Sequence, residues 1–237
     1  MPFYSRTIDI LEHYNPSGKA HWTIVFISFP EFPHVHDHVL KKFHGDSEIF
    51  FVNDRLKGDK REKWLNCDRV FRDTWKKIRN KTKGENILFL EGDVFVNMRI
   101  PDIPISGMIG WNVHTYKDHP DWYWWEKITS AHLKLFDLQT KEDCLYCAPS
   151  AICGFRRELL DEMIKEKYDA AYATSMISEF RNPNVVLKAG YPLESFKDWS
   201  GDLTKFSIIK YKPFDKKQEN RLHEFPGLFH PVKVRLI

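Results

Sequence analysis

Asn86-Ile-Leu-Phe-Leu90-Glu91-Gly92-Asp93, continued by Val94-Phe-Val96, is the stretch that decides the fold of this chain. Its first five residues form the most strand-like apolar run in the sequence, and the run ends abruptly at the acidic triplet. Short continuous apolar runs are typical of strands that are buried on both faces of a parallel sheet. In open α/β sheets ligands bind beyond the carboxyl ends of the strands, so these acidic residues lie where a binding site is expected.

Two earlier segments repeat the pattern of a buried strand. Residues 21–28 and 47–54 are apolar and rich in β-branched and aromatic residues. Residues 36–43 lie between them and carry apolar residues at helical spacing, which predicts a strand-helix-strand unit and therefore a parallel sheet. Residues 63–80 follow an approximately 3.6-residue apolar period, which predicts a surface helix that packs one face inward.

The second half continues the alternation of strands and helices. Residues 107–112 and 148–155 are predicted strands, a helix-like segment ends near residue 138, and residues 157–167 are a predicted helix. No internal repeat or low-complexity linker interrupts the chain. The sequence therefore predicts a single α/β domain over residues 1–237, with a mostly parallel central sheet flanked by helices.

The overall charge and hydropathy exclude some classes of protein. A net charge of +3, from 36 basic and 33 acidic residues, argues against a nucleic-acid binder. No run approaches the roughly 18 apolar residues of a membrane span, and the N-terminus lacks the apolar core of a signal peptide. We therefore expect a soluble, cytoplasmic protein with no signal peptide and no transmembrane segment. This expectation allows a peripheral contact with a membrane, because such a contact needs no spanning segment.

The four cysteines give little support for a zinc site. Cys144 and Cys147 have zinc-like spacing, but Cys67 and Cys153 do not supply a second pair at similar spacing. Free thiols in a reducing compartment are the expected state.

Glu91 and Asp93 can both coordinate the same cation. They are separated only by Gly92, where the backbone can pass close to a ligand. Carboxylate oxygens suit Mg²⁺ or Mn²⁺, which neutralise a departing diphosphate. The alternative is that these are turn residues at the end of a strand.

The stretch from residue 87 to residue 96 resembles the strand and Asp-X-Asp motif of GT-A glycosyltransferases, with Glu91 in place of the first aspartate. This resemblance implies a GT-A fold, a nucleotide-sugar donor and Mn²⁺ or Mg²⁺. It favours UDP because most of these families use it. The resemblance implies that Asp93 is the main metal ligand and that Glu91 and Gly92 contact the donor. It makes Glu91 an additional or indirect ligand of the metal.

A second resemblance covers residues 178–191. Glu179 is followed 11 residues later by Gly190, within Ala-Gly-Tyr, which is similar to the acceptor-side segment of inverting GT-A enzymes. The resemblance implies that Glu179 is the general base that deprotonates the acceptor hydroxyl. The alternative is a glutamate at a helix N-terminus, stabilised by the macrodipole after Ser178 as the cap.

The third resemblance is in the tail, where residues 225–233 look like the C-terminal histidine-to-lysine segment of several GT-A families. It implies that His230 completes the metal shell and that Lys233 meets the diphosphate. The alternative is an incidental histidine. Together the three resemblances imply a nucleotide-binding part over residues 20–97 and an acceptor-binding part over residues 98–237.

Several other residues receive candidate roles. Ser28 and Asp54, at the ends of the first two predicted strands, are assigned to the donor, although a strand-end Asn-Asp is also an ordinary turn. Asp68 and Arg72 lie one helical turn apart and are interpreted as a surface pair.

The tryptophan cluster within Trp122-Tyr-Trp124-Trp125 is assigned to the acceptor, because aromatic rings stack on the apolar faces of sugars. Its alternatives are core packing or a contact surface for protein or membrane.

The sequence therefore predicts a metal-dependent glycosyltransferase of glycan biosynthesis, with a UDP-sugar as donor and a glycan or glycoconjugate hydroxyl as acceptor. It is expected to invert the anomeric centre and to be bacterial or virus-encoded. A retaining enzyme of the same fold and a non-catalytic carbohydrate-binding module remain the alternatives. A nucleotidyltransferase would need a glycine-rich and basic loop after the first strand, and residues 28–34 do not contain one.

Overall fold

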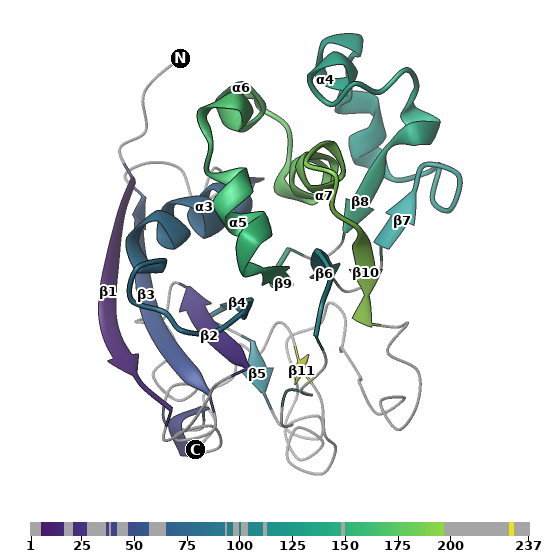
Figure 1. Ribbon diagram of the computed structural model, residues 1–237. Helices are drawn as coiled ribbons and strands as arrows, with labels where there is room; N and C mark the ends of the chain where they lie inside the picture. The colour runs from purple at the N-terminus through teal and green to yellow at the C-terminus, as the bar shows by residue number, and fades with distance from the viewer. Residues whose placement is uncertain are drawn as a thin grey trace.

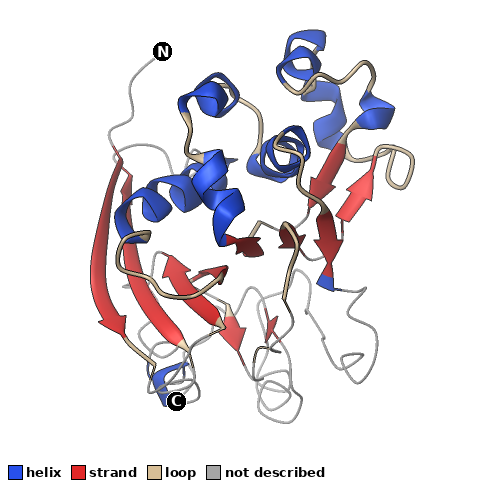
Figure 2. Cartoon of the chain, viewed as in Figure 1, coloured by secondary structure: helices blue, strands red, loops and turns tan. Residues whose placement is uncertain are grey.

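The computed structural model describes residues 6–16, 21–27, 37, 39–41, 47–56, 65–92, 94–96, 100, 104–110, 113–147, 150–196 and 228–229. Most helices lie on one face of a twisted central sheet (Figures 1 and 2), while the helical residues 39–41 lie on the other face, where Val39 packs in the same core as Phe26 and Leu88. The predicted α/β class with a mostly parallel central sheet is confirmed. In the described part of the chain, no helix has the length and apolar character needed to cross a membrane.

The central sheet has seven strands in the described residues, in the order β1-β3-β2-β4-β9-β6-β10. Only two of them, β1 and β9, run against the other five. The strand bounds are β1 (Arg6–Tyr14), β2 (Trp22–Ile27), β3 (Glu48–Leu56), β4 (Asn86–Glu91), β6 (Met108–Gly110), β9 (Ile152–Arg156) and β10 (Leu193–Ser195). Strands from both halves of the chain therefore share one sheet.

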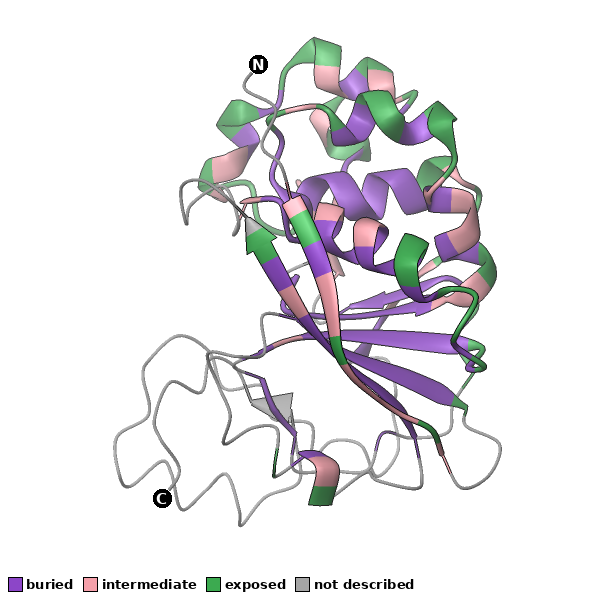
Figure 3. Ribbon diagram, turned by 90° about the vertical axis from the view of Figure 1, so that its left-hand side faces the viewer, coloured by how far each residue is buried: buried purple, intermediate pink, exposed green. Residues whose placement is uncertain are grey.

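The central strands are buried on both faces, as their apolar sequences require. Every residue of β2 and the first five of β4 are buried. Alternate side chains enter two cores: Val25 and Phe89 face the helices, while Phe26 and Leu88 face the opposite side. Figure 3 shows this contrast between the buried inner strands and the partly exposed edge strand β1.

Four helices lie over the sheet; the first, second and fourth lie at predicted helical segments, and the third was not predicted. These are α3 (Cys67–Ile78), α5 (Arg157–Met163), α6 (Asp169–Tyr172) and α7 (Ser178–Lys188). Helix α7 is followed by Gly190, whose φ of +81° is readily adopted only by glycine. The Tyr191 N–H donates to Val186 O at 3.2 Å, and this hydrogen bond caps the C-terminus of the helix. The interval between Glu179 and the Ala-Gly-Tyr segment is therefore the length of one capped helix.

The remaining elements are short. They are the two-residue strands β5 (Phe95–Val96) and β11 (Leu228–Phe229), the hairpin strands β7 (Val113–Thr115) and β8 (Leu145–Cys147), helix α4 (Ser130–Leu135), and the 3-10 helices η2 (Tyr123–Lys127), η3 (Lys141–Asp143) and η4 (Glu166–Tyr168). Strand β11 pairs antiparallel with β5, which brings the C-terminal segment next to the chain that follows β4.

Several predicted boundaries were wrong. The helix predicted over residues 157–167 ends at Met163, and the strand predicted over 148–155 begins at Ile152. The helix-like segment before residue 138 consists of η2 and the short α4. Strand β1 was not predicted, although Ile8 and Ile10 are β-branched, because its pairing with β3 is interrupted by a bulge between Ile10 and Glu12.

Candidate functional site

Of the predicted site residues, the structure describes Asp54, Glu91, Gly92, Glu179 and the three tryptophans. Ser28, Asp93, His230 and Lys233 lie outside the described residues. The predicted roles of these four stay predictions.

Glu91 is the last residue of β4, at the carboxyl end of a buried strand. Its backbone N–H donates to Ala151 O at 3.0 Å, so the residues that lead into β9 hold the strand end. Its side chain is half-buried, and the Cys67 thiol donates to its Oε1 at 3.3 Å. Gly92 follows in a buried turn. The sheet therefore presents Glu91 at the edge where a ligand site was predicted.

Glu179 lies in the first turn of α7, with its side chain half-buried. The Ser178 hydroxyl donates to its Oε2 at 3.1 Å. Burial, together with the nearby carboxylates of Glu91 and Asp68, raises the pKa of Glu179 to about 7, although hydrogen bonds to its carboxylate act to lower it. A carboxylate with a pKa near neutrality is suited to accept a proton.

Glu91 and Glu179 come from distant parts of the sequence, and the charges of both act on Cys67. Burial raises the pKa of the Cys67 thiol well above its usual value, and both carboxylates add to the increase. Cys67 begins α3, so the N-termini of α3 and α7 both lie at this cluster, where the helix dipoles favour negative charge. We call Cys67, Glu91, Ser178 and Glu179 the carboxylate site.

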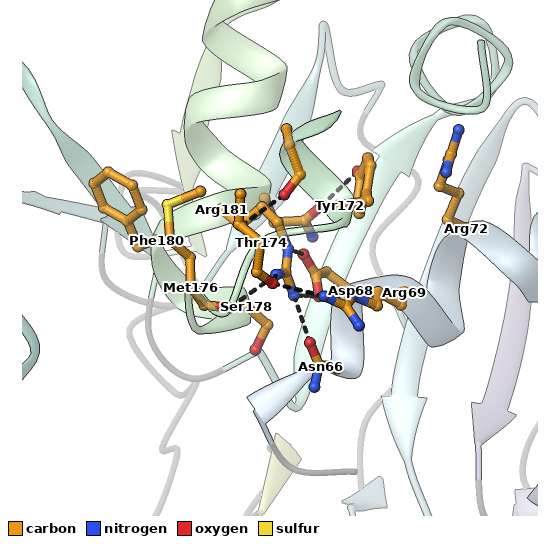
Figure 4. Close-up of polar contacts among 12 residues, drawn as sticks. Asn66, Asp68, Arg69, Arg72, Tyr172, Thr174, Met176, Ser178, Phe180 and Arg181 are labelled. Atoms are coloured by element: carbon orange, nitrogen blue, oxygen red, sulfur yellow. Dashed lines mark hydrogen bonds and ion pairs between the residues drawn. The ribbon is translucent and has the colours of Figure 1, made fainter. Parts of the chain in front are cut away.

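A buried ion pair joins the two helices at the carboxylate site (Figure 4). Arg181 Nε lies 2.6 Å from Asp68 Oδ2, and Arg181 Nη2 lies 2.7 Å from Asp68 Oδ1. Both side chains are fully buried. The guanidinium also donates to Asn66 Oδ1 at 3.0 Å and to the carbonyls of Thr174 and Met176 at 3.0 and 2.8 Å. This bidentate pair fixes α7 against α3.

The sequence did not indicate this pair. Arg181 follows Glu179 by two residues in an ordinary helical pattern, and its partner lies more than a hundred residues away. The interpretation of Asp68 and Arg72 as a surface pair was wrong, because both are buried and each has another partner. Arg72 pairs with Asp169 and donates to the carbonyls that end α5, including Met163 O at 3.1 Å.

Ser178 does not cap α7, contrary to its predicted role. The cap position is Ile177, which makes no side-chain cap hydrogen bond. The Ser178 hydroxyl instead lies 3.1 Å from the Ser150 hydroxyl and bonds to Glu179. The expectation of a glutamate at a helix N-terminus is confirmed, and it is compatible with a role as base.

Asp54 lies within β3 rather than after it. Its carboxylate pairs with Arg6 Nε at 3.0 Å. Arg6 Nη1 also donates to Asn66 O at 3.4 Å, and Asn66 precedes α3. Arg6 therefore connects Asp54 to Asn66, which directly precedes Cys67 of the carboxylate site. The predicted contact between Asp54 and the donor stays a prediction.

The three tryptophans of the predicted acceptor platform differ in exposure. Trp125 is only 2% exposed, and its indole N–H donates to His119 O at 2.9 Å. A ring packed in the core has no face for a sugar, so the platform role of Trp125 is wrong and the core-packing alternative applies to it. Trp122 is half-buried and stacks on Tyr146, with 4.2 Å between ring centroids, and Trp124 is also half-buried.

Among the described residues, no group of three or more His, Cys, Asp or Glu side chains is arranged to hold a metal ion. Glu91 is the one predicted ligand that the structure describes. The pKa of Glu179 is raised partly by the negative charge of Glu91, so a cation placed between them would relieve this repulsion. Carboxylate oxygens are ligands that suit Mg²⁺ or Mn²⁺, and the metal stays a prediction.

The cysteine side chains that the structure describes are thiols. Cys67, Cys144 and Cys153 are buried and form no disulfide, as expected from the sequence. Burial raises the pKa of the Cys144 thiol to about 12, so it stays protonated near neutrality. The side chain of Cys147 lies outside the described residues.

No family model matches the chain, and no curated protein matches it in sequence. Among solved structures, it is similar to a glycosyltransferase involved in the glycosylation of the major capsid of PBCV-1, with a TM-score of 0.48 and 11% identity over 90% of this chain and 93% of the other. It is also similar to the galactosyltransferase LgtC in complex with donor and acceptor sugar analogs, with a TM-score of 0.40 and 10% identity over 85% and 83% of the two chains. An active-site mutant of LgtC gives a TM-score of 0.42. Identities and scores this low assign no residue a role.

Proposed function

We propose that this protein transfers a sugar from a nucleotide-diphosphate donor, most simply a UDP-sugar, to a hydroxyl group of a glycan or glycoconjugate. The observation that supports the proposal is the electrostatic effect of Glu91, the last residue of β4, on Glu179 in the first turn of α7. The two acidic motifs were selected from the sequence independently, and both carboxylates also act on the Cys67 thiol.

In the proposed reaction, Glu179 removes the proton of the acceptor hydroxyl while the acceptor oxygen bonds to the anomeric carbon. The bond from that carbon to the diphosphate oxygen breaks, and the nucleoside diphosphate leaves with the electron pair. Attack from the face opposite the diphosphate inverts the configuration. The pKa of Glu179 near 7 lets the same side chain exist in both protonation states at neutral pH.

A divalent cation would stabilise the charge that develops on the departing diphosphate. Glu91 is placed to contribute to its shell, together with the predicted ligands Asp93 and His230, and Lys233 is assigned to the diphosphate. The N-termini of α3 and α7 add positive ends of helix dipoles at the carboxylate site. Residues 20–97 would hold the nucleotide and residues 98–237 the acceptor.

A thermal-shift screen tests the proposal against a carbohydrate-binding module. UDP-sugars and GDP-sugars would be added with and without MnCl₂, because a ligand that binds the folded state raises Tm. We expect a UDP-sugar to raise Tm only with Mn²⁺. A shift with free oligosaccharides but with no nucleotide-sugar would contradict the proposal. NMR analysis of the anomeric configuration of the product then separates inversion from retention.

A further inference from the structure

A chain of two buried hydroxyls leads to the carboxylate of Glu179: Ser178 bonds to the carboxylate, and Ser150 bonds to Ser178. Ser178 Oγ lies 3.1 Å from Glu179 Oε2 and 3.1 Å from Ser150 Oγ. The two serines are 0% and 4% exposed. Ser150 directly precedes Ala151, whose carbonyl accepts from Glu91 N–H. The hydroxyl pair therefore ties Glu179 to the loop that also holds Glu91.

A hydroxyl can both donate and accept, so this chain can serve either protonation state of the glutamate. When Glu179 is ionised, Ser178 donates to it and accepts from Ser150. When Glu179 has taken a proton, the carboxylic acid can donate to Ser178, which then donates to Ser150. Only the hydroxyl hydrogens rotate, and no proton leaves the chain of three groups.

We propose that Ser178, supported by Ser150, is a positioning residue for the base: it fixes the direction of the Glu179 carboxylate and stabilises its ionised form before proton transfer. The inference rests on the proposed role of Glu179. The proton balance is unchanged, since the proton that Glu179 gains comes from the acceptor hydroxyl.

The charged and titratable groups around Glu179 come from three elements. Cys67 and Asp68 begin α3, Glu91 ends β4, and Arg181 lies in α7. Burial and the two carboxylates raise the pKa of Glu179, whereas the Ser178 hydrogen bond lowers it. Removing the hydroxyl leaves the other groups in place, so its effect can be isolated.

The direct test is a ¹³C NMR titration of the glutamate carboxyl groups in the metal-free full chain. The Glu179 signal is assigned by its absence in Glu179→Gln. We expect Ser178→Ala to move the titration midpoint of Glu179 upward by about one pH unit, since one hydrogen bond to a charged group is lost. Ser178→Cys has nearly the same size but a weaker donor, so an intermediate midpoint is expected.

Ser150→Ala is a second variant, which leaves Ser178 in place. It should move the titration midpoint of Glu179 upward by less than Ser178→Ala does. In Ser178→Ala, kcat for transfer from the UDP-sugar selected by the thermal-shift screen should fall about tenfold, with KM nearly unchanged. Unchanged midpoints in both alanine variants would overturn the inference. Normal transfer by Glu179→Gln would instead overturn the role of the base, so the two failures are distinguishable.

Discussion

The raised pKa of Glu179 is caused by the groups that surround it. Burial and the carboxylates of Glu91 and Asp68 raise its pKa to about 7, while Ser178 opposes the change by donating to the ionised form. The folded protein therefore binds a proton at Glu179 more readily than the unfolded chain does. This contribution favours the folded state most below about pH 4.5 and declines as the pH rises from there to about 7.

The pH dependence of transfer follows from the same shift. A general base must be ionised, so kcat/KM should fall about tenfold per pH unit below the pKa of Glu179 and reach a plateau above it. This pKa is about 7 in the metal-free protein, and a cation beside Glu91 would lower it. Initial rates over a pH series with a single UDP-sugar and Mn²⁺ measure this limb. A rate that stays constant from pH 5 to pH 8 would contradict a base with this pKa.

The sequence indicated the two carboxylates but not what surrounds them. Glu91 was predicted because it ends an apolar run, and Glu179 because it resembles an acceptor-side motif. Cys67 donates to Glu91, and Arg181 pairs with Asp68, only after long segments have folded together, and no local pattern encodes such contacts.

Helices α3 and α7 form the rigid support of the carboxylate site. Their contact depends on the buried ion pair between Asp68 and Arg181, and Arg181 also donates hydrogen bonds to Asn66 Oδ1 and to two backbone carbonyls. Buried charges are tolerated only when they are paired and fully hydrogen-bonded, and this pair meets both conditions.

Breaking this pair should destabilise the protein strongly. Arg181→Met leaves the Asp68 carboxylate buried without its cation, so we expect the free energy of unfolding to fall by about 3–5 kcal/mol in urea denaturation. Lys188→Met is the matched control in the same helix, because Lys188 pairs with the mostly exposed Asp137, and we expect a loss below about 1 kcal/mol. Equal losses in the two variants would contradict the supporting role of the buried pair.

The buried strands of the sheet were predicted with nearly correct bounds, because β2, β3 and β4 carry continuous apolar runs. Short elements were less predictable. Strand β10 has three residues and β5 has two, so neither displays a period. The antiparallel direction of β9 also has no signature in its own residues and depends on how the chain returns between β4 and β6.

At the scale of the whole molecule, one sheet combines strands from both halves of the chain. Strand β4 ends at Glu91, and the charge of Glu91 acts on Glu179 at the start of α7. A donor held by the first half and an acceptor held by the second stay predictions. Strand β11 pairs with β5, so Leu228 and Phe229 lie beside Val96 and Phe95. The predicted ligand His230 directly follows β11 in the sequence.

The most direct measurement compares sugar transfer and donor binding in Glu179→Gln, with Glu158→Gln of α5 as the control. Glutamine keeps the size of the side chain but cannot accept the proton, so we expect transfer to fall at least about a hundredfold. The Tm increase caused by the UDP-sugar and Mn²⁺ should be retained, and the control should transfer at the wild-type rate. Transfer by Glu179→Gln at the wild-type rate would contradict the assignment of Glu179 as the base.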